Sequence, residues 1–280
     1  MVFNLTIDCD TYIGDKKVNQ DIFLMKTMDK VNVIVDEDEM KMQHKPYLFI
    51  IADGHGSQDD QGKQVAEFIV NTFYQLLNIE TLSINKTYLE KCFDLVDKKL
   101  QLTEIDYHKI GSTVIIGILY FINGKLKLVV CNTGDCRCVI DFKGNQMSTF
   151  DHKPEDLNEK KRFDEINQRT DLKKKLYFNH EKNGVPRIGN MAVSRSFGDK
   201  NCDPYIIFKP DIYYFTDIGQ WIVFACDGLW DFYSNKAVID TLNLMKTNNY
   251  ANALISCVKQ TSLRENEEMD NTTIIVIKID

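Results

Sequence analysis

The sequence lacks any apolar run that approaches the roughly 18 residues needed by a membrane-spanning helix, so we predict no membrane span. It also lacks the basic stripe typical of nucleic-acid binders, since the net charge is −7 and the longest lysine block covers only residues 173–175. The first residues, MVFNLTIDCD, show no basic region followed by a long apolar core, which argues against a signal peptide. These absences exclude nucleic acid as an expected partner and favour a cytoplasmic protein, with a nuclear location left open. We expect a monomer.

Several motifs that carry chemistry are absent as well. The chain has eight cysteines but no Cys-x-x-Cys and no cysteine–histidine cluster with zinc spacing. Most of the eight lie inside apolar runs, so we predict buried free thiols in a reducing compartment. No Gly-x-Ser-x-Gly occurs, which leaves a serine hydrolase without support. The segment GSQDDQGK (56–63) fails as a phosphate-binding loop because it has one residue too many between its glycines and Gln64 at the serine or threonine position.

The hydrophobic pattern of the chain changes its period along the sequence. Apolar residues recur every three or four positions in 61–79 and 88–102, which predicts amphipathic helices. Asn123–Gly124 separates two apolar runs and predicts a hairpin, and Lys143–Gly144 suggests a second one. The almost wholly apolar run 46–52 predicts a central strand. Further strands are expected over 32–35, 112–121, 125–130, 137–142, 146–150, 205–208, 212–215, 221–225 and 271–279, further helices within 155–175, 234–245 and 250–263, and an exposed loop over the acidic run 36–39.

This order of elements predicts an α+β fold. The strands are joined by hairpins and the helices come in blocks, which argues against a doubly wound parallel sheet. Two helical layers flanking two mainly antiparallel sheets would bury the apolar faces of all these elements. We therefore expect a four-layer α-β-β-α sandwich.

Acidic residues repeatedly stand where an apolar run stops. IIADGHG (50–56) ends with Asp53 and His55 between glycines, and IVFACD ends at Asp227. A single carboxylate at a strand end is usually a turn or cap residue. Several carboxylates beside the most hydrophobic runs of the chain instead point to one shared site. The same placement is found at Asp21, Asp135, Asp231 and Asp270.

Carboxylates gathered in a partly buried site repel one another and need raised pKa values or cations. Oxygen-only ligands favour a hard ion, Mn²⁺ or Mg²⁺, over zinc or copper. Two such ions form the usual clamp for in-line attack on a phosphate. Gly54 suits this centre, since a residue without a side chain lets its carbonyl approach an ion closely. The sequence therefore predicts a two-metal site for phosphoryl chemistry.

Eight short motifs in a fixed order carry a family resemblance. They are KKVNQD (16–21), DGHG (53–56), GST (111–113), GDCR (134–137), DHKP (151–154), MAVSRSFGD (191–199), DGLWD (227–231) and DN (270–271). In these motifs the chain resembles the protein phosphatase 2C family, the metal-dependent serine/threonine protein phosphatases, from about residue 10 to its end. The resemblance implies a single catalytic domain over 1–280, with an excursion at about 155–184 in the position of the family's variable flap.

The resemblance also implies roles for individual residues and phosphoproteins as substrates. It implies hydrolysis of phosphoserine and phosphothreonine by in-line attack of a water that bridges two Mn²⁺ or Mg²⁺ ions. Asp53 would bridge the ions, Gly54 would offer its carbonyl, Asp227 and Asp270 would complete one ion's shell, and Asp21 would hold a metal-bound water. Asp135, Asp227 and Asp231 match the residues that hold a third, weaker ion in some members. His55 matches the proposed general acid, Lys16 stands where the substrate phosphate is gripped, and Arg195 is a retained candidate for substrate binding.

Two positions depart from the family pattern. The family usually has arginine where this chain has Lys16, and lysine is a point charge without arginine's bidentate fork. Gln20 replaces an acid that is common beside Asp21, which removes one negative charge near the predicted ions. Two alternatives remain open on the sequence: a catalytically impaired homologue that acts as a binding module, and a metal-dependent phosphatase of small molecules. The retained Asp53 and Asp227 favour the active protein phosphatase.

Overall fold

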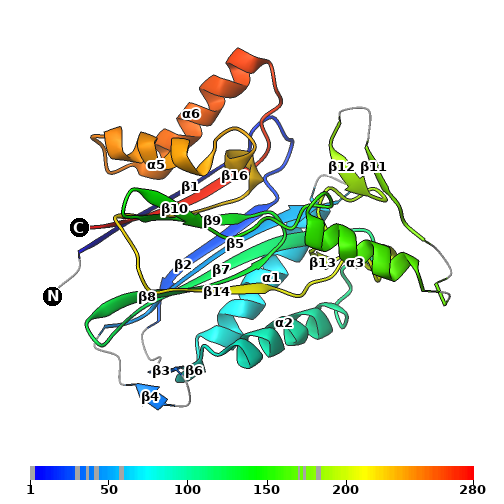
Figure 1. Ribbon diagram of the computed structural model, residues 1–280, viewed down its shortest axis with the longest axis horizontal. Helices are drawn as coiled ribbons and strands as arrows, with labels where there is room; N and C mark the ends of the chain where they lie inside the picture. Colours follow the sequence, from blue (N-terminus) through cyan, green and yellow to red (C-terminus); the bar gives the residue numbers. More distant parts are fainter. Residues whose placement is uncertain are drawn as a thin grey trace.

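The computed structural model describes residues 4–28, 32–35, 38–40, 44–56, 60–169, 171–172, 175–180 and 184–280. Within these residues two β-sheets pack face to face, and helices cover the outer face of each sheet (Figure 1). This arrangement is the α-β-β-α sandwich that the sequence predicts. No helix in the described ranges combines the length and the apolar character needed to cross a membrane.

The first sheet is built around the hairpin predicted at Asn123–Gly124. Both turn residues have positive φ, 50° and 72°, as a tight two-residue hairpin requires. Every residue of β7 is buried, because helices cover one face of this strand and the second sheet covers the other. The strands lie in the order β14 (Asp211–Phe215), β8 (Lys125–Thr133), β7 (Gly111–Ile122), β5 (Tyr47–His55) and β2 (Asp21–Thr27), all antiparallel, and the short β13 (Phe197–Gly198) also pairs with β7.

The second sheet faces the first across an apolar core. The predicted turn at Lys143–Gly144 has φ values of 50° and 82° and joins its two last strands. Phe49 of the first sheet and Phe224 of the second stack with ring centroids 5.8 Å apart, which places the centre of the core between the sheets. The strands lie in the order β1 (Leu5–Tyr12), β16 (Thr272–Ile279), β15 (Trp221–Ala225), β9 (Arg137–Phe142) and β10 (Asn145–Ser148).

Strand β1 is the strand of this sheet over which no element was expected from the sequence. Its acids alternate with Leu5, Ile7 and Cys9, which pack on the core between the sheets, and all of its residues are half-buried. These acids also bind a helix. Asp8 accepts a hydrogen bond of 2.8 Å from the backbone N–H of Ala251, and Asp10 accepts one from the side chain of Asn252. Asp8 therefore caps the start of a helix that packs on the sheet, a contact between residues far apart in the chain.

The two amphipathic helices predicted over 61–79 and 88–102 and the two helices expected over 234–245 and 250–263 are confirmed. Phe73 and Phe93, from the two helices on the first sheet, pack with ring centroids 4.7 Å apart. The side chain of Asn85 accepts a hydrogen bond from the backbone N–H of Tyr88. Asn85 thereby caps the start of the second of these helices. Helices α1 (Gln61–Leu77) and α2 (Lys86–Leu100) cover the first sheet, and α5 (Asn235–Leu244) and α6 (Tyr250–Glu265) cover the second (Figure 1).

The excursion expected at about 155–184 contains the helix α3 (Leu157–Asn167) and the strand β11 (Phe178–His180), which pairs in a small hairpin with β12 (Pro186–Ile188) just after it. The strand predicted over 205–208 is wrong. Tyr205 is fully buried beside Phe163 and Ile188, so this apolar segment anchors the excursion to the body of the protein and does not extend a sheet.

The loop predicted over 36–39 is correct at most in part. Asp38 and Glu39 belong to the strand β4 (Asp38–Met40), whereas Asp36 and Glu37 lie outside the described residues. A short strand can form from charged residues when backbone hydrogen bonds to a neighbour are available. Here β4 pairs with the predicted strand β3 (Asn32–Val35), which also pairs with β6 (Thr81–Ser83). Two short helical segments complete the chain, η1 (Lys200–Cys202) and α4 (Asp227–Trp230).

Candidate active site and metal centre

The predicted acids converge at one end of the two sheets. Antiparallel neighbours begin and end at the same edge, so Asp21 at the start of β2 and Asp53 near the end of β5 are direct partners in the sheet. Asp227 follows β15 as the first residue of α4, and Asp135 follows β8. A cleft of about 840 Å³ opens at this edge, and its floor carries four carboxylates, those of Asp53, Asp135, Asp227 and Asp270.

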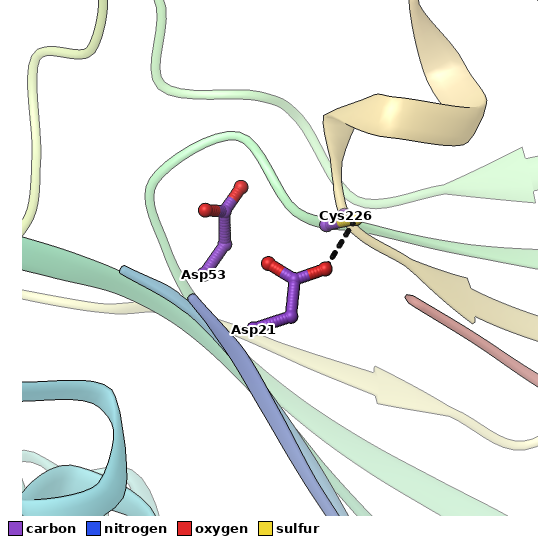
Figure 2. Close-up of side chains that lie close together, drawn as sticks. All are labelled: Asp21, Asp53 and Cys226. Atoms are coloured by element: carbon purple, nitrogen blue, oxygen red, sulfur yellow. Dashed lines mark hydrogen bonds between the residues drawn. The ribbon is translucent and has the colours of Figure 1, made fainter. Parts of the chain in front are cut away.

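Asp21 lies behind this floor and next to Asp53 (Figure 2). One of its carboxylate oxygens accepts hydrogen bonds from Thr273 Oγ1 at 2.7 Å and from the thiol of Cys226 at 3.3 Å. Its other oxygen, Oδ1, is buried without a hydrogen-bond partner in the described part of the chain. A carboxylate oxygen without a partner in a buried acidic site is a ligand or second-layer acceptor for a cation or a cation-bound water.

Ionising the carboxylates of the floor is unfavourable, because they are buried and lie close to one another. Burial raises the pKa of Asp53 well above its usual value, and the nearby carboxylates of Asp21 and Asp227 raise it further. The pKa of Asp227 is likewise raised well above its usual value by burial and by Asp135. Because the donors are carboxylate oxygens crowded together, the residues fit hard divalent cations, whose charge would stabilise the ionised forms.

Metal-free protein is therefore expected to lose stability as the pH rises from 5 to 7.5. Burial raises the pKa of Asp21 from 3.8 to about 6, so its contribution to stability is complete below pH 4 and is lost as the pH rises through 6. A difference of this size corresponds to about 3 kcal/mol in total, of which about half is lost between pH 5 and 7.5. The measurement is the melting temperature in EDTA across this pH range. Asp21→Asn keeps an acceptor for Thr273 and should flatten the curve, whereas a melting temperature that rises toward pH 7.5 would contradict the argument.

Lys153 supplies a positive charge within this acidic cluster. Its ammonium group forms an ion pair with Asp135. Burial lowers the pKa of Lys153, but the carboxylates of Asp135, Asp227 and Asp231 outweigh that effect and raise it above its usual value. Sequence reasoning quoted this residue only as a letter of the DHKP motif and assigned it no role. The spacing of acids in the sequence does not reveal the role of Lys153, because the fold brings this residue to Asp135, Asp227 and Asp231 from elsewhere in the chain.

His55 is held at the edge of the cleft by a carboxylate that sequence reasoning missed. Its Nε2 lies 2.7 Å from Oδ2 of Asp199, which also accepts a hydrogen bond of 2.6 Å from Ser196 Oγ. A Cβ on Gly111 would lie 2.1 Å from the same Asp199 oxygen, so only glycine leaves room for this pair. Burial lowers the pKa of His55, but the charge and hydrogen bond of Asp199 outweigh it, so the pKa is raised.

Gly54 has a packing role in addition to its predicted role as a carbonyl donor. A Cβ on Gly54 would lie 2.3 Å from the carbonyl oxygen of Gly62, and a Cβ on Gly62 would lie 2.4 Å from the backbone nitrogen of His55. The two glycines therefore let helix α1 contact the end of β5. This close approach fixes the backbone that carries both Asp53 and His55.

Gly62→Ala should lower the stability of the protein by about 1–3 kcal/mol, because overpacking against backbone atoms forces a shift. The activity should fall by more than the loss of folded protein explains, since the shift moves the end of β5. Thermal unfolding and phosphatase assays at a temperature where the variant is folded measure the two effects. Gln64→Ala on the exposed face of α1 is the matched control. Unchanged stability and activity in Gly62→Ala would contradict the close contact.

Lys16 lies at the cleft, as the family pattern predicts. Its ammonium nitrogen is 3.3 Å from Oδ2 of Asp270 and 3.5 Å from Oε1 of Glu268. Gln20 also lines the cleft, and its backbone N–H donates to the side chain of Asn271. The two positions that depart from the family pattern thus lie on the same side of the site, next to Asp270.

Two predicted site residues are placed differently. Arg195 is absent from the described residues that line the cleft; its guanidinium forms ion pairs with Glu159 at 2.6 Å and with Asp211 at 3.0 Å. These contacts tie α3 to β14, and substrate binding by Arg195 stays a prediction. Asp231, at the end of α4, is also not among those lining residues, although its charge acts on Lys153.

Comparisons with known sequences find relatives of one family. A model of the protein phosphatase 2C family matches residues 20–271 of the chain. Probable protein phosphatase 2C 58 of Arabidopsis thaliana is 33% identical over 220 residues, which cover 76% of this chain and 71% of that protein. A PP2C-like domain-containing protein, R307, of Acanthamoeba polyphaga mimivirus is 36% identical over 124 residues, covering 43% of this chain and 68% of that protein.

Solved structures show the same fold. The crystal structure of serine-threonine phosphatase 2C from Toxoplasma gondii superposes with a TM-score of 0.72 at 18% identity, covering 98% of this chain and 94% of that one. The catalytic domain of the serine threonine protein phosphatase PstP, crystallised with two manganese ions, superposes with a TM-score of 0.61 at 14% identity and covers 99% of each chain.

The chain therefore combines a carboxylate-lined cleft at one end of its sheets with an α-β-β-α sandwich that it shares with solved protein phosphatases. The match to the family model extends over nearly the whole chain. The chain belongs to the protein phosphatase 2C family.

Proposed function

We propose that this protein hydrolyses phosphoserine and phosphothreonine in proteins, with two Mn²⁺ or Mg²⁺ ions held by the carboxylates of the cleft. The observation that supports it most directly is the convergence of Asp53, Asp135, Asp227 and Asp270 on the floor of one cleft whose edge carries His55. The solved relative PstP binds two manganese ions. When bound, such ions supply an activated nucleophile and positive charge for the phosphoryl oxygens.

We propose that the position of each carboxylate decides how it contributes to holding these ions. Asp53, with Asp21 as its partner across the sheet, is placed to hold ions at the centre of the floor. Asp227 and Asp270 come from the other sheet and would complete the site from the opposite side. Asp21 is more deeply buried than these three residues and already accepts a hydrogen bond from Thr273. It would therefore orient a water and would not contact the substrate.

A third, weaker ion would have to compete with Lys153. The ammonium group of Lys153 already pairs with Asp135 and interacts with Asp227 and Asp231, the residues that the family pattern gives to that ion. Two divalent ions together with this lysine would neutralise the cluster. We therefore propose two tightly held ions, with any third ion weaker.

Substrate binding and proton transfer fall to the rim of the cleft. Lys16, beside Asp270, would bind the phosphate as a point charge. His55 would donate its proton to the departing serine or threonine oxygen, because that oxygen leaves as a strong base. With Nε2 engaged by Asp199, Nδ1 is the ring nitrogen through which His55 would reach the leaving group. Asp199 is a positioning residue in this scheme, since it acts through His55.

Asp199→Asn should lower kcat by about 10- to 100-fold on a phosphoserine peptide, less than the roughly 10²–10⁴-fold that general acid catalysis contributes, because His55 itself remains. The loss on p-nitrophenyl phosphate should be much smaller, because p-nitrophenolate departs readily without a proton. The ratio of the two rates is the measurement, and a merely structural defect would lower both equally. Ser196→Ala removes the other donor to Asp199 and should keep most of the ratio. Equal losses on both substrates in Asp199→Asn would contradict the assignment.

A titration with Mn²⁺ separates this function from the two alternatives. Hydrolysis of a phosphoserine peptide that appears with Mn²⁺ supports the protein phosphatase. A much higher kcat/KM on phosphorylated metabolites than on phosphopeptides would favour a phosphatase of small molecules. No hydrolysis of either class, or of p-nitrophenyl phosphate, at millimolar Mn²⁺ would favour an impaired homologue that acts as a binding module.

A further inference from the structure

The mouth of the cleft carries the opposite charge from its floor. Four carboxylates line the floor of the cleft, of which only that of Asp270 is exposed, whereas most of the other charged lining residues that are exposed are basic and form its rim. They come from three separate segments: the loop between β1 and β2, the loop between α2 and β7, and β12 of the hairpin that follows the excursion. The rim consists of Lys16, Lys17, His108, Lys109 and Arg187. A basic rim is unexpected on a chain whose net charge is −7, so its charge is local to the cleft.

The part of the rim around Lys109 is fixed beside the proposed leaving-group site. Backbone N–H groups of Asp199 and Asn201 donate to the carbonyls of Ile110 and His108, at 3.1 and 3.0 Å. The loop that carries Lys109 is therefore bound on both sides of that residue to the segment whose Asp199 holds His55. Both His108 and Lys109 are exposed at the surface.

The other two parts of the rim lie around the same opening. Lys16 and Lys17 are exposed, and Lys16 stands beside Asp270. Arg187 is half-buried on β12, where its Nη1 donates to the carbonyl oxygen of Asn190 at 2.7 Å, a contact that holds the guanidinium at the turn facing the cleft. A peptide whose phosphorylated residue reaches the floor must therefore pass cationic groups on either side.

We propose that the cleft selects phosphopeptides in which acidic residues flank the phosphorylated residue. This inference rests on the proposed phosphatase function and adds its substrate class. Two divalent ions would offset the four carboxylates of the floor, so the charge that a flanking residue meets is that of the rim. An acidic neighbour of the phosphoresidue then forms ion pairs with Lys109 and Arg187, whereas a basic neighbour is repelled.

The first test compares three phosphoserine peptides of equal length, flanked by glutamate, by alanine or by lysine. The expected order of kcat/KM is glutamate, then alanine, then lysine, with about three- to tenfold between neighbours, the range for a few exposed charge pairs. The differences should lie mainly in KM and should shrink at 0.5 M NaCl, where exposed charges are screened. Equal kcat/KM values for the three peptides at low salt would overturn the proposal.

The second test reverses one charge of the rim. Lys109→Glu should lower the ratio of kcat/KM for the glutamate-flanked peptide to that for the lysine-flanked peptide by about three- to tenfold, and Lys109→Gln should lower it by less. Lys125→Glu makes the same charge change at the first residue of β8, beside the opposite end of β7, and should leave the ratio unchanged. An unchanged ratio in Lys109→Glu would overturn the assignment to this rim.

A binding measurement separates this proposal from the proposed function. Fluorescence anisotropy in Mn²⁺, with labelled peptides that carry a non-hydrolysable phosphonate in place of the phosphate, reports the rim without turnover. Preference for the glutamate-flanked peptide that Lys109→Glu weakens supports the rim even in a protein that hydrolyses nothing. Hydrolysis without any such preference would retain the phosphatase and overturn the rim.

Discussion

Asp227→Asn is expected to lower metal-dependent hydrolysis by about 10³-fold or more, because divalent ions contribute several kcal/mol of charge stabilisation in the transition state. Asparagine keeps the shape of the side chain but removes its negative charge. Asp227 is one of the most strongly perturbed acids of the floor, with its pKa raised well above the usual value by burial and by Asp135. The measurement is kcat/KM for a phosphoserine peptide as a function of Mn²⁺ concentration.

The same variant carries its own control for folding. Removing a buried, repelled charge should leave the metal-free protein at least as stable as the parent, so lost activity with an unchanged or higher melting temperature in EDTA points to the metal site. Asp240→Asn on the exposed surface of α5, where Asp240 pairs with Lys236, is the matched substitution and should keep full activity. Activity of Asp227→Asn within tenfold of the parent would contradict the proposed centre.

Saturating Mn²⁺ is expected to raise the melting temperature by about 5–10 °C. A ligand at 100 times its dissociation constant stabilises the native state by about 2.7 kcal/mol, and for a chain of this size 1 kcal/mol shifts the melting temperature by about 2–4 °C. The physical reason is the crowded floor, where burial and Asp21 raise the pKa of Asp53 and a cation would relieve the repulsion. Differential scanning fluorimetry with and without Mn²⁺ measures the shift.

Asp53→Asn should lose most of this shift, because it removes the carboxylate at the centre of the floor. Asp240→Asn should keep it, and sodium chloride at matched ionic strength should not reproduce it, since general screening does not place a cation among the carboxylates. A melting temperature that stays constant up to millimolar Mn²⁺ would contradict a native metal site.

Local pattern was sufficient where an element is stabilised by its own residues. The periodic apolar faces predicted the helices α1 and α2, and Asn123–Gly124 predicted the β7–β8 turn from the φ angles that these residues tolerate. Pattern failed where a distant partner decides. Asp8 of β1 binds the start of α6, and Tyr205 is buried against the excursion, so contacts with distant segments decide the structure at both places.

The sequence by itself determined the family, the four-layer architecture and the acids of the centre, because motif order and hydrophobic period are written in neighbouring residues. Only the tertiary structure decided which residues support that centre: Lys153 against Asp135, Asp199 behind His55, and the contact between Gly54 and Gly62. It also gathered the basic rim from three segments of the chain. The reason is that pKa shifts, close packing and the electrostatic potential of the cleft depend on distances between atoms. Folding sets those distances for residues that are far apart in the sequence.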